Sequence, residues 1–128
     1  MNIQISTTAL LLDIAKADEI IDENEIKIIK NILIDFFDIS MDESETIINN
    51  AKQHLEESTD RYQFCKKINA EFDYEQKIQF ILSIYKIAFI DNELHYLEEH
   101  LIKQIANLLH VEHRDLIESK LEIKNLLN

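Results

Sequence analysis

Residues 10–33 read LLLDIAKADEIIDENEIKIIKNIL, and residues 81–109 read ILSIYKIAFIDNELHYLEEHLIKQIANLL. The second stretch repeats the pattern of the first at a constant offset of 73 residues (91 − 18). Identical residues occupy the pairs Ile14/Ile87, Ala15/Ala88, Asp18/Asp91, Glu25/Glu98, Ile29/Ile102, Lys30/Lys103 and Ile32/Ile105, and Ile21 and Ile28 correspond to Leu94 and Leu101. Apolar residues kept in register are what a duplicated helical hairpin needs in order to bury the same faces twice. The repeat therefore predicts two helical hairpins, 6–37 and 74–109, related by an internal pseudo-twofold.

The composition favours an all-α fold. The 128 residues are 46% hydrophobic and 30% charged, and they include no glycine and no proline. Glycine-rich phosphate loops, and an organic cofactor held by one, are therefore not expected. Helix starts are indicated where Ser or Asp precedes Glu or Gln by three residues, because the two residues then cap the helix together. This spacing occurs in Asp22/Glu25, Ser40/Glu43 and Asp73/Gln76.

Caps and apolar spacing together predict one compact domain of seven helices. The helices are expected near residues 6–18, 23–37, 41–56, 59–71, 74–90, 95–109 and 112–126, with the first starting at Ser6 or Thr7. Since glycine is absent, helix ends that need a left-handed residue are expected to use Asn, Asp or His. Asn50 and Asn92 are the candidates.

The charge balance excludes several classes of partner. With 13 basic and 25 acidic residues the net charge is −12, the wrong sign for binding nucleic acid or an anionic membrane surface. No apolar run reaches the ~20 residues of a membrane span, so no direct membrane insertion is expected. The start of the chain has no signal-peptide pattern, which predicts a cytoplasmic protein. The single cysteine, Cys65, is expected to be a buried apolar residue.

Acidic residues surround the turn inside each predicted hairpin. They are Asp18, Asp22 and Glu25 in the first copy and Asp91, Glu93 and Glu98 in the second. Helix capping is a sufficient role for Asp22 and Glu25. Asp18 and Asp91 instead fall at helix C-terminal ends, where the helix dipole disfavours a carboxylate. Their compensating partner is either the N-terminus of the next helix or a divalent cation, whose identity stays open.

Known metal signatures do not fit these turns. An EF-hand loop that began at Asp18 or Asp91 would need glutamate at its twelfth position, but Ile29 and Ile102 stand there. His95 and His100 are five residues apart, so they do not share one helical face as the histidines of zinc-protease helices do. His95, Glu99 and His100 are therefore considered only as accessory ligands.

The turns and the end of the chain resemble the TerB family, small helical proteins linked by name to tellurite resistance. The family pattern A-K/R-A-D-G-x-I-D-x-x-E reads AKADEIIDENE at residues 15–25, and its second element reads AFIDNELHYLEEHLI at residues 88–102. The closing segment LLHVEHRDLI at residues 108–117 is also similar, so the resemblance covers essentially the whole chain. Where the family has glycine after each aspartate, this chain has Glu19 and Asn92. Glutamate tolerates a left-handed backbone poorly, so the first turn is the one expected to differ in shape.

The resemblance implies a single cytoplasmic TerB-like helical domain over residues 1–128, associated with stress responses to tellurite and other toxic agents. It brings no enzymatic reaction. Metal binding by the acidic turns has been proposed for the family, and related domains occur as modules beside co-chaperone and membrane-associated domains. Two hypotheses follow. In one, the acidic turns bind a divalent cation weakly; in the other, the chain is a metal-independent protein–protein interaction module. A protein partner is expected in either case, and the oligomeric state stays open.

Overall fold

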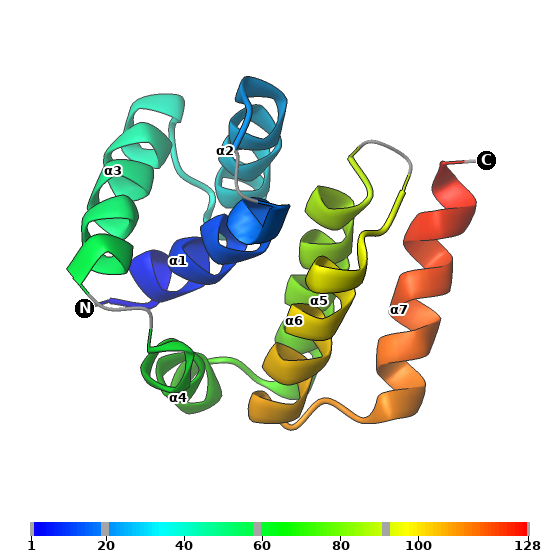
Figure 1. Cartoon of the computed structure of the whole chain (residues 1–128). Helices are drawn as coiled ribbons and strands as arrows, with labels where there is room; N and C mark the ends of the chain where they lie inside the picture. Colours follow the sequence, from blue (N-terminus) through cyan, green and yellow to red (C-terminus); the bar gives the residue numbers. More distant parts are fainter. Residues whose placement is uncertain (1, 19–20, 58–59, 91–92, 128) are drawn as a thin grey trace.

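The computed structural model describes residues 2–18, 21–57, 60–90 and 93–127, and within these ranges the chain is all-helical (Figure 1). The described part forms seven α-helices and one 3-10 turn, with no strand, which confirms the predicted all-α fold. In chain order they are α1 (Ile3–Ala15), η1 (Lys16–Asp18), α2 (Glu23–Phe37), α3 (Met41–Glu57), α4 (Arg61–Glu71), α5 (Tyr74–Ala88), α6 (Tyr96–Leu108) and α7 (His113–Leu126). In the described part, no helix is both long enough and apolar enough to cross a bilayer.

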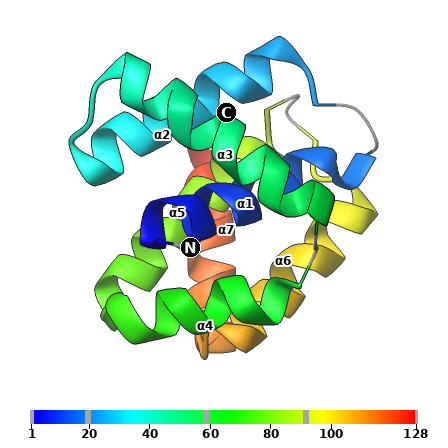
Figure 2. The ribbon, with the colours of Figure 1, turned by 90° about the vertical axis from the view of Figure 1, so that its left-hand side faces the viewer.

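Helix α1 is the centre of the molecule. It packs against α2, α3, α4, α5 and α6, and Figure 2 shows it with α2 and α3 on one side and α4 on the other. Nine of its thirteen residues are buried. A helix whose apolar residues lie on all of its sides is enclosed by other helices in this way.

The start of α1 differs from the prediction of Ser6 or Thr7. The N-cap is Asn2, whose side-chain oxygen accepts a hydrogen bond from the Ile5 N–H (2.8 Å). Thr7 and Thr8 are buried within the helix, and their hydroxyls donate to the carbonyls of Ile3 and Gln4 at 2.7 Å. A threonine that bonds back to its own helix is satisfied in the interior, so it need not mark a helix start.

The two predicted hairpins are present as the packed pairs α1–α2 and α5–α6. The central apolar pairs of the repeat have matching burial. Ile14 and Ile87 are fully buried, as are Ile29 and Ile102. Each copy therefore buries the same helix faces, and all of these residues belong to one hydrophobic core.

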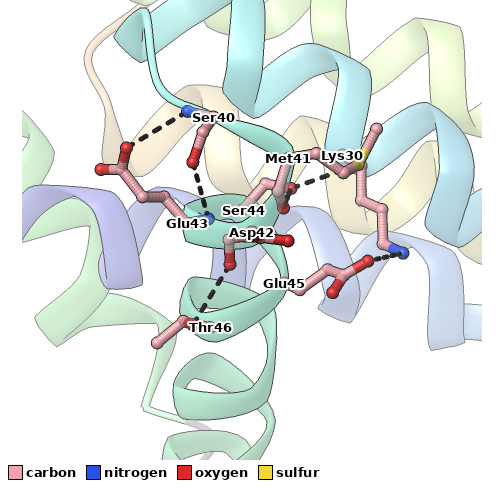
Figure 3. A network of polar contacts seen from close by, with 8 residues as sticks. All are labelled: Lys30, Ser40, Met41, Asp42, Glu43, Ser44, Glu45 and Thr46. Atoms are coloured by element: carbon pink, nitrogen blue, oxygen red, sulfur yellow. Dashed lines mark hydrogen bonds and ion pairs between the residues drawn. The ribbon is translucent and has the colours of Figure 1, made fainter.

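The three predicted capping boxes are confirmed. Asp22 with Glu25 and Asp73 with Gln76 each exchange two hydrogen bonds at the helix start. At the start of α3, the Ser40 N–H donates to Glu43 Oε1 (3.3 Å) and the Glu43 N–H donates to Ser40 Oγ (3.1 Å), as Figure 3 shows. The same figure shows the ion pair between Lys30 of α2 and Glu45 of α3, with 3.1 Å between Nζ and Oε1.

Two helix ends take left-handed residues other than those predicted. Asp38 (φ 53°) follows α2, and His110 (φ 59°) follows α6. Asn50 lies inside α3 with helical geometry, so that prediction is wrong, and Asn92 lies outside the described residues. Helix α4 begins at Arg61, after the N-cap Asp60, two residues beyond the predicted start at residue 59.

Helix α7 lies at one edge of the molecule beside α5 (Figure 1). Tyr74, the first residue of α5, hydrogen-bonds to Asp115 of α7 and accepts from the Glu112 N–H (3.1 Å). Further along α7, Lys120 Nζ lies 3.3 Å from Glu99 Oε1 of α6. These contacts join α7 to α5 and to α6.

Candidate functional site: two acidic turns

The first acidic turn joins α1 to α2. The chain leaves α1 through η1, which ends at Asp18, and α2 begins after the N-cap Asp22. Asp22 is exposed, and its Oδ1 accepts from the Glu25 N–H (2.8 Å), while the Asp22 N–H donates to Glu25 Oε1 (3.2 Å). Only the backbone of Asp18 is described, so the predicted role of its carboxylate lies outside the described residues. The predicted caps Asp22 and Glu25 are therefore in place.

The second acidic turn joins α5 to α6. Helix α5 ends at Ala88, and its cap Phe89 donates its N–H to the Tyr85 carbonyl (2.9 Å). Helix α6 begins after the N-cap His95, which makes no capping hydrogen bond through its side chain. Glu93 is exposed in this connection, and the predicted ligand Asp91 lies outside the described residues. This turn therefore starts its second helix with different chemistry from the first.

Both turns place a glutamate inside the protein at the same repeat position. Glu25 is 4% exposed and Glu98 is 3% exposed. Each is the third residue of its helix, where unpaired backbone N–H groups and the helix dipole favour a negative charge. Burial of a carboxylate is nevertheless costly, because its charged form loses water. Because a buried glutamate occurs at both equivalent positions, Glu25 and Glu98 are the central feature of the candidate site.

The sequence contains a signal for this burial that the interpretation of Glu25 as a simple cap did not use. Glu25 stands four residues before Ile29, and Glu98 stands four residues before Ile102. Residues four apart lie on the same helix face. Both isoleucines are fully buried, so the glutamates share the buried face of α2 and α6.

The fold also brings the first turn against the second hairpin. The 3-10 turn η1 packs against α6, the helix that carries Glu98, and α1 contacts both α5 and α6. The two copies are therefore in direct contact with each other near the first acidic turn. A ligand or partner at this place could sense both hairpins.

The accessory residues are largely committed to other contacts. Glu99 Oε1 lies 3.4 Å from Lys103 Nζ and 3.3 Å from Lys120 Nζ. Partial burial raises the pKa of Glu99, but the hydrogen bonds and charges of Lys120 and Lys103 outweigh it and lower the pKa overall. His100 is exposed, stacks on the Tyr96 ring at 6.5 Å, and lies 3.4 Å from the Gln104 amide nitrogen.

Within the described ranges, no three His, Cys, Asp or Glu side chains gather closely enough to hold a metal ion. His95, Glu99 and His100 thus do not form a site among themselves. Since the predicted sets also include Asp18 and Asp91, the prediction of a cation at the acidic turns stays a prediction. The chemistry available there is that of carboxylate oxygens, which suit hard cations such as Ca²⁺, Mg²⁺ and Mn²⁺.

The protein is a small all-helical domain built around two helical hairpins that repeat in register. Residues 4–121 match the family model described as Tellurite resistance protein TerB, and the chain belongs to this family. The resemblance recognised in the two turns is therefore confirmed. No curated protein and no solved structure shows a significant match to the chain.

Proposed function

We propose that this chain is a non-enzymatic stress-response domain of the tellurite-resistance type that binds a divalent cation weakly through its two acidic turns. The observation that supports this proposal is the matched burial of Glu25 and Glu98, at 4% and 3% exposure, beneath turns that also carry Asp22 and Glu93. Where a carboxylate is buried, a bound cation offsets part of the cost of removing its charge from water.

Weak rather than tight binding is expected because of the ligands. Asp22 already accepts a hydrogen bond from the Glu25 N–H, so its carboxylate has a second task. Neither turn has the glycine or the twelfth-position glutamate of an EF-hand loop. The ion would act as a sensor-like stabiliser of the turns and not as a permanent structural metal.

The one thiol of the chain is not suited to act as a catalytic nucleophile. Cys65 is 1% exposed, and burial raises the pKa of its thiol to about 12. The charge of Arg61 lowers this pKa and the charge of Asp13 raises it, both to a smaller extent. A reactive cysteine needs the thiolate form and access to its substrate. Cys65 is instead a packing residue of α4.

Thermal unfolding of chelator-treated protein tests the cation. Ca²⁺, Mg²⁺, Mn²⁺ and Zn²⁺ are added in turn, and an ion at 100 times its Kd should add ~2.7 kcal/mol to the free energy of unfolding, or roughly 8 °C in Tm. Asp22→Asn and Glu98→Gln should reduce the shift, because both remove charge with little change in shape.

Asp73→Asn is the matched control for Asp22→Asn. Asp73 caps α5 through the same type of box but lies away from both turns, and asparagine caps as well as aspartate does. The proposal is supported by a selective shift that survives Asp73→Asn and falls in the other two variants. If no ion raised the Tm, or if Asp73→Asn reduced the rise as much as Asp22→Asn does, the proposal would be contradicted.

The alternative function is a metal-independent protein–protein interaction module. A specific observation favours it, namely a cleft of about 640 Å³ between α2, α5 and α7, whose lining includes none of the predicted ligand residues. Binding of a protein partner that is unchanged by chelator and by Glu98→Gln would support this function over cation binding. Binding that requires an added cation would contradict it.

A further inference from the structure

A hollow of about 640 Å³ lies along α5, between α2 and α7. We call it the α5 cleft. Its lining residues are Ile32, Asp35 and Phe36 of α2, Asp73, Glu75, Gln76, Gln79, Leu82, Ser83 and Lys86 of the α5 segment, and Glu122, Ile123 and Leu126 of α7. Helices α2 and α7 both pack on α5, and Figure 1 shows α5 between them.

The lining of the cleft follows helical faces on all three elements. Gln76, Gln79, Ser83 and Lys86 recur at intervals of three or four residues, so they form one stripe along α5. Asp73 and Lys86 are thirteen residues apart, so the lining extends for about 20 Å along the axis of α5 at 1.5 Å per residue. A groove of this length can receive a helix of three to four turns.

The floor of the cleft combines the polar stripe of α5 with apolar side chains from α2 and α7. Ile32 and Ile123 are 8% and 4% exposed, and Phe36 stacks on Phe72 with ring centroids 5.3 Å apart. At the open side, Leu126 is 72% exposed although it lies on α7 next to this floor. A buried floor with an exposed leucine on its wall is suited to receive the apolar face of another helix.

The rim of the cleft is acidic. Asp35, Asp73, Glu75 and Glu122 are exposed, and Lys86 is the basic residue that faces them in the lining. The occupant must therefore be cationic on the flanks of its apolar face. A second copy of this chain fits poorly, because its net charge of −12 would place like charges against the rim.

We propose that the α5 cleft binds one amphipathic helix of a partner protein, with an apolar stripe against Ile32, Leu82 and Ile123 and with lysines or arginines beside the acidic rim. This inference rests on the alternative function above and names the chemistry of its partner. It does not involve Glu25, Glu98 or a cation.

A fluorescent 18-residue peptide of leucines and lysines, with leucine at helical spacing, is the probe. Its Kd is measured by anisotropy at physiological salt against the full chain, beside a scrambled peptide of the same composition. We expect the patterned peptide to bind more tightly than the scrambled one, since both carry the same charge. Equal affinity would mean that the surface only attracts cations, which overturns the proposal.

Two matched pairs of variants locate the binding. Leu126→Asp should weaken the patterned peptide, whereas Leu97→Asp, at a 60% exposed leucine of α6 outside the cleft, should not. Asp35→Lys combined with Glu122→Lys should weaken it by roughly 10-fold. Glu56→Lys combined with Glu57→Lys on α3 changes the net charge equally and should have a smaller effect, because both residues lie outside the cleft.

The failure of this inference is distinguishable from failure of the interaction module. If the cleft variant and its control lost equal affinity for the peptide in both pairs, the cleft would not be the docking site. A protein partner that still bound the two cleft variants would leave the interaction module intact. Sedimentation of the chain alone tests the remaining occupant. A dimer broken by Leu126→Asp would assign the cleft to a second copy and overturn the proposal.

Discussion

In the first hairpin Asp22 and Glu25 close the start of α2 with a reciprocal capping box, whereas in the second hairpin the matching N-cap, His95, makes no side-chain capping bond. The glutamates that follow are nevertheless buried to the same extent, at 4% and 3% exposure. A capping box is thus sufficient to explain Glu25 but does not explain Glu98. The feature shared by the two copies is the buried carboxylate, and the N-cap is the part that differs.

Lys30 and Lys103 also occupy the same repeat position but have different partners. Lys30 pairs with Glu45 of the following helix α3, while Lys103 pairs with Glu99 within its own helix. Exposed ion pairs contribute little to stability, so their partners can change between copies at small cost. Buried positions cannot change as freely, and their match is what makes the two hairpins comparable.

The largest expected effect tests whether the two copies contribute equally to the core. Ile29 and Ile102 are both fully buried at equivalent positions. Ile29→Ala and Ile102→Ala should each lower the free energy of unfolding by about 2–5 kcal/mol, through lost burial and the cavity left behind. Urea unfolding followed by circular dichroism at 222 nm measures both.

The two values should agree within about 1 kcal/mol if the equivalent, fully buried sites of Ile29 and Ile102 leave similar cavities. Ile28→Ala serves as a control, since Ile28 is only half-buried and should cost less than either. A large difference between Ile29→Ala and Ile102→Ala would show that the repeat is one of sequence alone, with unequal packing of its two copies.

The next largest effect is expected from changing the N-caps of α2 and α6. Asp22→Ala should destabilise the protein by about 0.5–2 kcal/mol, because the Glu25 N–H loses its acceptor. His95→Asp should have the opposite sign and stabilise by up to ~1 kcal/mol, since Asp at this position can form a capping box with Glu98. Thermal unfolding at neutral pH measures both, with Asp73→Ala as the matched loss of a cap on α5. A destabilising His95→Asp would show that the histidine has a role that an N-cap cannot replace.

Much of the fold follows from local rules that act in the sequence itself. The capping spacing at Asp22, Ser40 and Asp73 specified three helix starts correctly, because the bonds involved span only three residues. The start of α1 did not follow, since Thr7 and Thr8 satisfy their hydroxyls inside the helix. The left-handed ends at Asp38 and His110 were also missed, because Asn, Asp and His compete for such positions and nothing local decides between them.

The site was predictable only in part for a different reason. The repeat located Glu25 and Glu98 from the sequence, and their spacing from Ile29 and Ile102 contained the signal for burial. The α5 cleft contained no such signal, because Asp35, Glu75 and Glu122 come from three helices and meet only in the fold. The pairing of Glu99 with Lys120 of α7 is likewise a tertiary contact that no local spacing predicts.

The smallest effect concerns that tertiary contact, which exists in only one copy. At the position of Glu99 in the second hairpin, the first hairpin has Ile26 (99 − 73 = 26). Lys120 and Lys103 lower the pKa of Glu99 below its ordinary value of 4.5 despite partial burial. Folding therefore favours the charged form, so the stabilisation is present above pH 4.5 and is lost as the pH falls through the folded-state pKa.

Glu99→Gln should lower the free energy of unfolding by no more than ~1 kcal/mol at pH 7, and its difference from wild type should shrink toward pH 3. Glu45→Gln, which breaks the exposed pair with Lys30, is the control. If the difference for Glu99→Gln stayed constant between pH 7 and pH 3, the contact of α6 with α7 would depend on shape and not on charge.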